Sequence, residues 1–160
     1  MTTSFDSDLD LTISRVIRGP REAVWKAWTD PWSFAQWWLP APTLCHVVEM
    51  DVTPGGSLVT RMSEDGVTYV DHFQGCYLDI EPLQRIVLTN SLVKGWRPAE
   101  NPFMTAVITL GDHPEGTDYV ARVMHKSQAD RDMHSDMGFY DGWGTVADQL
   151  KELVESDGLD

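Results

Sequence analysis

Apolar and polar residues alternate at the start of the chain and then change to a helical spacing. Residues 9–17 show the period-two pattern of an outer strand. A helical stripe follows over residues 20–29. Asp30 and Pro31 then provide a cap and a first helical position for a second, aromatic-rich helix that Pro40 and Pro42 end. The pattern predicts one strand followed by two short helices.

The middle of the chain has the pattern of strands separated by turn residues. The predicted strands cover residues 45–51, 57–63, 67–81, 84–91, 103–111 and 117–127. Short connections between successive strands favour antiparallel pairing. Residues 93–102 form a longer connection that carries Trp96, and we expect it to act either as a lid over a pocket or as a clamp on the sheet edge.

From residue 128 to about residue 155 the spacing stays helical, which predicts one long C-terminal helix. One narrow stripe of this helix contains Ala129, Met133, Asp136, Tyr140, Trp143, Ala147, Leu150 and Val154. Its second half is apolar and suits an anchor against a sheet. Its first half includes Asp136, which either meets water, a cation or a donor in a pocket, or faces solvent near the helix start.

The order of elements predicts an α+β fold in which the long helix covers the apolar face of a curved, seven-stranded antiparallel sheet. Gly138, Gly142 and Gly144 lie inside the predicted helix, where each costs about 1 kcal/mol relative to alanine. We expect them to allow close approach of the helix to the sheet or to Trp37 and Trp38, or to kink the helix at the mouth of a pocket.

Length and charge narrow the possible partners. The 160 residues suit a single domain over residues 1–160, with residues 1–8 expected to be disordered. The formal net charge of −13 disfavours nucleic acid and anionic membranes as partners.

Without a signal peptide or an apolar span, a cytoplasmic location is expected. Cys45 and Cys76 have no metal-binding spacing, so neither a metal nor another cofactor is expected. An exposed edge at residues 9–17 makes a homodimer reasonable.

Several motifs together resemble a known family. They are Val24-Trp25-x-x-Trp28-Thr29-Asp30-Pro31 with Trp37-Trp38, Pro54-Gly55-Gly56, Gly75-x-Tyr77 with Glu81-Pro82-x-x-Arg85-Ile86, His134-x-x-Met137-Gly138-Phe139-x-x-Gly142-Trp143, and Asp148-Gln149-Leu150. In this order they resemble the START-like (SRPBCC) superfamily, in the branch named after the activator of the heat-shock protein 90 ATPase. The resemblance implies the helix-grip fold. For the function, the resemblance leaves three possibilities: a ligand carrier, a polyketide cyclase or aromatase, or a chaperone-activating domain.

The sequence favours an apolar small-molecule ligand between the sheet and the C-terminal helix. Aromatic rings supply contact area in such pockets, and a few polar groups orient the ligand. Strand alternation would place Tyr69, Asp71 and Phe73 on one face and His72 on the other. The candidate ligand-binding residues are Trp38, Tyr69, Asp71, Phe73, Met133, Asp136, Met137 and Tyr140.

No hydrolase, zinc-protease or phosphate-loop motif is present, so an enzymatic role is the less favoured expectation. A cyclase-like enzyme would use Asp136, Tyr140 or Asp71 to move a proton. His72 and His125 are further titratable candidates, and Arg61 and Arg122 could neutralise an anionic substrate. The third alternative is an interaction module for a chaperone, which the acidic charge and single domain disfavour.

Overall fold

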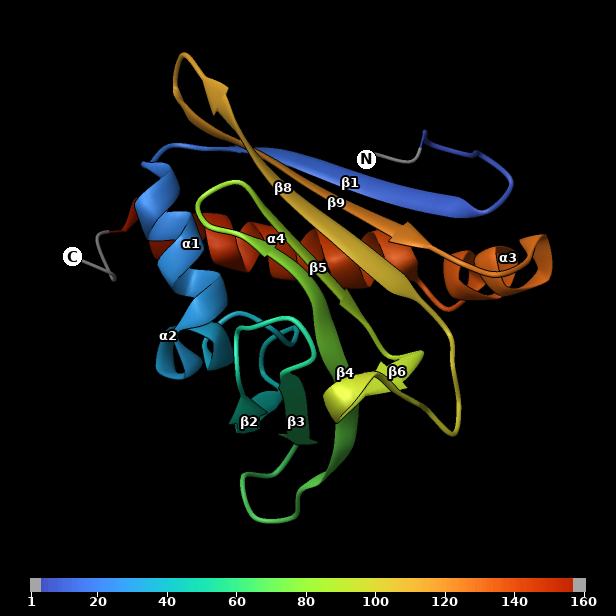
Figure 1. Ribbon diagram of the computed structural model, residues 1–160. Coiled ribbons are helices and arrows are strands. Elements are labelled where there is room, and N and C mark those ends of the chain that lie inside the picture. Colours follow the sequence, from blue (N-terminus) through green and yellow to red (C-terminus); the bar gives the residue numbers. More distant parts are fainter. Residues whose placement is uncertain (1–3, 157–160) are drawn as a thin grey trace.

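The computed structural model describes residues 4–156 and contains a seven-stranded antiparallel sheet with a long helix across one face (Figure 1). The strands are β1 Asp10–Ile17, β2 Leu44–Met50, β3 Ser57–Ser63, β4 Val70–Glu81, β5 Arg85–Thr89, β8 Thr105–His113 and β9 Gly116–Met124. The helices are α1 Arg21–Thr29, α2 Pro31–Ala35, α3 Gln128–Asp136 and α4 Phe139–Glu155. This architecture confirms the predicted α+β, helix-grip fold.

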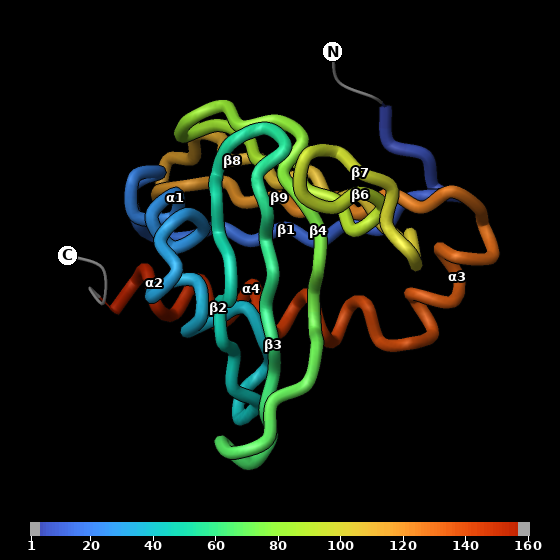
Figure 2. The backbone as a smooth tube through the Cα atoms, turned by 60° about the horizontal axis from the view of Figure 1, so that its bottom comes forward, coloured from blue at the N-terminus to red at the C-terminus, as the bar shows by residue number. Residues whose placement is uncertain are grey.

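The strand order is β1-β9-β8-β5-β4-β3-β2, so the first strand pairs with the last one. Figure 2 shows the sheet curving over α4, with α1 and α2 at one end of that helix and α3 at the other. The anchor half of the predicted stripe packs as expected, since Ala147, Leu150 and Val154 are buried. The sheet and α4 therefore share one hydrophobic core.

The prediction of a single C-terminal helix is wrong at one point. The helix breaks between α3 and α4, where Gly138 has a φ of +95°, a left-handed conformation that favours glycine. The break resets the helical phase, so the stripe predicted across it does not stay on one face. Asp136 and Tyr140 are consequently exposed, whereas Phe139 is buried. Of the two readings of Asp136, the solvent-facing one is correct.

The other two helix glycines differ in their surroundings. A Cβ on Gly144 would lie 3.1 Å from the guanidinium of Arg15, so this glycine allows α4 to approach β1 closely. A Cβ on Gly142 would meet no atom within 4 Å, because it faces open space. Close approach to the sheet thus explains Gly144, and Gly142 borders a cavity.

A β-bulge in β4 overturns the predicted alternation around Asp71. Thr60 pairs with Phe73 and Arg61 pairs with Asp71, so His72 is an extra residue in the ladder. The bulge lets His72 and Phe73 both border the same cavity, while the carboxylate of Asp71 is fully exposed. A one-residue insertion of this kind exchanges the faces of the residues before it.

The long connection forms a small hairpin that clamps onto a turn. It contains β6 Leu92–Val93, the 3-10 turn η1 Lys94–Trp96 and β7 Arg97–Pro98. The Trp96 ring packs over Gly55, where an added Cβ would lie 3.0 Å away, and the amide of Gly95 donates to the carbonyl of Gly55 at 2.8 Å. Of the two predicted roles, the clamp fits this packing.

The outer edge of β1 is covered by polar side chains of α4. Lys151 Nζ donates to the carbonyl of Val16 at 2.9 Å, and the amide of Arg18 donates to Glu155 at 2.8 Å. A strand of a second chain would have to displace these bonds to pair with this end of β1. The homodimer through this strand remains a prediction.

The chain start lies partly outside the described residues, since residues 1–3 are not described. Residues 6–10 form a turn in which the carbonyl of Asp6 accepts hydrogen bonds from the amides of Leu9 and Asp10. Disorder over residues 1–8 stays a prediction. Among the described helices, none has the length and apolar character needed to cross a membrane.

Candidate functional site

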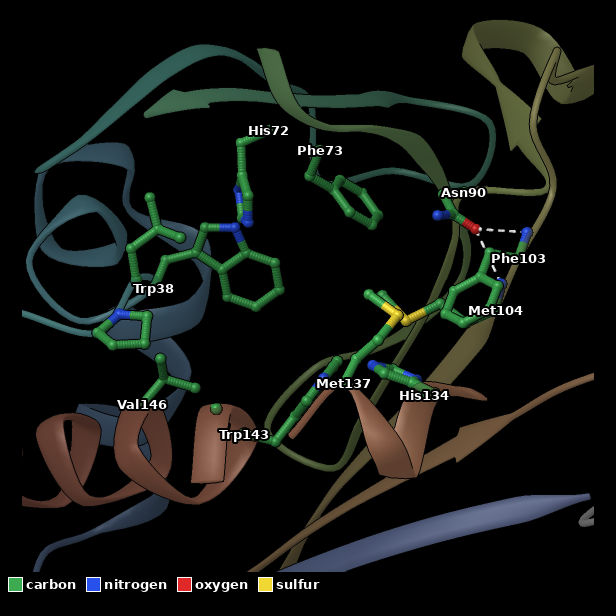
Figure 3. A pocket seen from close by; sticks show the side chains of 13 residues that line it. Trp38, His72, Phe73, Asn90, Phe103, Met104, His134, Met137, Trp143 and Val146 are labelled. Carbon is green, nitrogen blue, oxygen red and sulfur yellow. Dashed lines mark hydrogen bonds between the residues drawn. The ribbon is translucent and has the colours of Figure 1, made fainter. Parts of the chain in front are cut away.

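A cavity of about 350 Å³ lies between the β4 side of the sheet and the α3–α4 junction (Figure 3). It is lined by Trp38, Leu39, Pro40, His72, Phe73, Asn90, Phe103, Met104, His134, Met137, Gly142, Trp143 and Val146. Its volume is within the range of small-molecule sites. None of the lining residues is Lys, Arg, Asp or Glu, so the wall is apolar with a few neutral polar groups.

The structure separates the predicted site residues into two groups. Trp38, Phe73 and Met137 lie in the cavity wall. The others lie outside it: Tyr69, Asp71, Met133, Asp136 and Tyr140. The helix break explains the last three and the β4 bulge explains Asp71. Tyr69 precedes β4 and packs against the ring of His46, with 6.2 Å between ring centroids.

Trp38 joins the aromatic core to the cavity. Its ring makes edge contacts with Phe73 and Trp143, at centroid distances of 6.0 and 6.1 Å. Trp28 and Trp37 use their indole N–H groups, which donate to Tyr119 Oη at 3.2 Å and to the carbonyl of Ala27 at 2.9 Å. The Nε1–H of Trp38 is buried and has no acceptor among the described residues. An unpaired buried donor is costly, and this nitrogen has almost no accessible surface, so an acceptor would reach it only after a shift of the Trp38 ring or its neighbours.

The segment that carries Trp38 is held by one side chain of α4. Gln149 Nε2 donates to the carbonyls of Trp37 and Leu39 at 3.0 and 2.8 Å. Its Oε1 accepts from the amide of Ala41 at 2.7 Å. These three bonds fix a stretch without regular structure next to α4, so one wall of the cavity depends on Gln149.

We expect Gln149→Ala to lower the free energy of unfolding by about 1–3 kcal/mol, because it leaves partly buried backbone groups unpaired. Urea denaturation measures the loss. Gln149→Met keeps the side-chain length without the amide and serves as the control. A Met variant as stable as wild type would show that packing rather than hydrogen bonding holds the segment.

Asn90 presents a donor to the cavity. Its Oδ1 accepts hydrogen bonds from the backbone amides of Phe103 and Met104 at 3.1 and 2.9 Å. Because only the oxygen of a side-chain amide can accept, these two bonds determine which end of the amide is Oδ1 and which is Nδ2. The Nδ2 group is therefore free to point elsewhere, and Figure 3 shows it turned away from Phe103. Asn90 follows β5 directly, where a strand end meets the cavity.

Two histidines form a chain of hydrogen bonds that ends at the cavity. His125 Nδ1 bonds to the carbonyl of Leu9 at 2.8 Å, and His125 Nε2 bonds to His134 Nδ1 at 2.9 Å. A carbonyl can only accept, so His125 donates from Nδ1. With both rings neutral, His125 Nε2 must accept and His134 Nδ1 must donate. His134 Nε2 then carries a lone pair, and no group among the described residues bonds to it.

The surroundings of His134 keep its imidazole neutral. Burial, followed by the charge that His125 can carry, lowers the pKa of His134 from 6.5 to about 4. Phe103 and Phe139 flank the ring at centroid distances of 5.0 and 5.1 Å. At neutral pH the ring is an acceptor of hydrogen bonds and a weak base.

Sequence reasoning did not select Asn90, Phe103, Met104, His134 and Trp143 as ligand-binding residues, although they line the cavity. His134 and Trp143 belong to the quoted motif around Gly138, which was the available signal. Arg61 and Arg122, considered for an anionic substrate, do not line it. Within residues 4–156, no group of three His, Cys, Asp or Glu side chains could hold a metal ion.

The sheet, the gripping helix and the cavity between them define a helix-grip domain of the START-like class. The profile of one family, described as "Activator of Hsp90 ATPase homolog 1-like protein", matches residues 18–155. The chain belongs to this family. No curated protein matches it significantly.

Solved structures agree with this assignment. A Nitrosomonas europaea protein is 36% identical with a TM-score of 0.86, over 96% of this chain and 99% of its own. A Chromobacterium violaceum protein is 27% identical with a TM-score of 0.71, over 91% and 96%. An AHSA1-like protein from Aeromonas hydrophila shares the fold, at 22% identity and a TM-score of 0.66 over 94% and 95%.

Proposed function

We propose that the protein binds a small apolar or aromatic molecule in the cavity between the sheet and the α3–α4 junction. The observation that carries this proposal is an apolar cavity of about 350 Å³ whose wall also holds two polar groups without partners among the described residues, Nδ2 of Asn90 and Nε2 of His134. Such a combination of apolar area and a few unpaired polar groups is typical of ligand sites. The absence of charged residues from the lining favours an uncharged ligand.

A cyclase or aromatase activity has less support. Of the residues considered for proton transfer, Asp71, Asp136, Tyr140 and His125 do not line the cavity, whereas His72 does. His134 also does, but a base with a pKa of about 4 is a poor proton acceptor at neutral pH. Binding without chemistry is therefore the function that the site supports best.

The test is a titration of the purified protein with the neutral fluorophore N-phenyl-1-naphthylamine, together with mass spectrometry of molecules that copurify. Saturable, one-to-one binding that a copurified molecule or another neutral aromatic compound displaces would support the proposal. Neither saturable binding nor a copurified molecule would overturn it. The anionic analogue 1-anilinonaphthalene-8-sulfonate serves as a comparison and should bind more weakly, because no cation lines the cavity.

A further inference from the structure

The cavity lining includes an acceptor and a donor whose identities are fixed by the other hydrogen bonds of their side chains. Among the described residues, the acceptor is Nε2 of His134 in the neutral pair, whose other nitrogen is bonded to His125. The donor is Nδ2 of Asn90, whose oxygen is held by the backbone amides of Phe103 and Met104. Figure 3 shows both side chains on the side of the cavity formed by Phe103 and Met104.

The direction of the histidine chain decides which ligand groups can pair with His134. The carbonyl of Leu9 imposes the Nδ1–H form on His125, and His125 in turn imposes the Nδ1–H form on His134. An ether, ketone or carboxylate oxygen has no hydrogen to donate to the resulting lone pair. A hydroxyl group has one, and its oxygen can also accept a hydrogen bond.

We infer that the ligand is an uncharged hydroxyl compound, a phenol or alcohol on an apolar ring system, whose O–H donates to Nε2 of His134. This inference rests on the proposed function and specifies its substrate class. Asn90 Nδ2 donates to an oxygen of the same molecule. His125 is a positioning residue, because it touches no ligand and acts by fixing the tautomer of His134.

The experiment compares the binding of naphthalene, 1-naphthol, 1-methoxynaphthalene and 1-naphthoate to the full chain at neutral pH. We expect 1-naphthol to bind about fivefold to tenfold more tightly than 1-methoxynaphthalene, as one hydrogen bond between neutral groups would give. 1-Naphthoate should bind more weakly than 1-naphthol. His134→Phe should reduce the ratio of the affinities for 1-naphthol and 1-methoxynaphthalene to about one.

The outcomes separate the two claims. Equal affinities for the hydroxyl and methoxy compounds would overturn the inference and leave the proposed function standing. Failure of all four compounds to bind would overturn both. A preference for 1-naphthol that survives in His134→Phe would also overturn the inference, because the hydroxyl would then have another partner.

A second readout needs no variant at the cavity wall. The nitrogen chemical shifts of ¹⁵N-labelled histidine report which ring nitrogen carries the proton, and we expect His134 to be protonated at Nδ1. Protonation at Nε2 at neutral pH would overturn the inference. His125→Asn keeps a donor for Leu9, but its shorter side chain cannot reach His134 with its oxygen, so it should mix the two tautomers and reduce the preference for 1-naphthol severalfold.

Discussion

Gly142→Leu is expected to weaken the binding of N-phenyl-1-naphthylamine about a hundredfold while the protein stays folded. Gly142 lines the cavity, and a Cβ built on it meets no atom within 4 Å, so we expect a leucine side chain to extend into the cavity. Its four carbons would displace a similar number of ligand atoms, each contributing roughly 0.3–1.5 kcal/mol to binding. Fluorescence titration measures the loss.

Gly142→Ala is the matched control for this substitution. It relieves the cost of a glycine inside a helix and should raise the free energy of unfolding by about 1 kcal/mol, with little effect on binding. Normal binding by the stable Leu variant would mean that the probe occupies another site, which would contradict the proposed function. The pair therefore distinguishes filling of the cavity from stabilisation of α4.

Acidification from pH 7 to pH 4 is expected to remove about 2–3 kcal/mol of stability through His134 alone. The pKa of this group is about 4 in the folded chain and 6.5 in the unfolded one. Between these values the unfolded chain binds a proton that the native chain does not bind, so stability rises with pH in this window. The contribution is complete above pH 6.5 and is lost as the pH falls toward 4. Desolvation of His72 in the cavity wall also lowers its pKa and adds a loss of the same sign.

Urea denaturation at several pH values tests this expectation. His134→Gln cannot titrate, so its stability should fall less between pH 7 and pH 4 than that of wild type. His113→Gln, at the end of β8 and outside the cavity lining, controls for the general effect of losing a histidine. Parallel pH profiles of wild type and His134→Gln would show that His134 is as easily protonated in the native state as in the unfolded chain.

The sequence predicted the strands, the two short helices and the buried half of α4 because each has a regular period over many residues. The Asp30 cap is also readable from sequence, and its carboxylate accepts from the amide of Ser33 at 2.9 Å. Periodicity failed where one residue interrupted it. Gly138 reset the helical phase before α4, and the bulge at His72 reversed the faces of β4.

The cavity was harder to predict than the fold because its wall combines residues that are far apart in the chain. Asn90 and Met104 come from two different strand ends, and their contact depends on the pairing of β5 with β8. The pair of His125 and His134 likewise depends on how α3 folds back beside β9. Trp38 was predicted because an aromatic residue after a short helix signals a pocket by its chemistry alone.

The break at Gly138 gives α3 and α4 different degrees of burial, and with them different costs of displacement. Helix α4 has buried residues along its length, whereas α3 buries none, and His134 and Met137 border the cavity from α3 and its end. Displacing α3 therefore exposes little apolar surface and costs less free energy than displacing α4. If the cavity binds a ligand as proposed, displacement of α3 would open its path of entry and release, while α4 stays in place.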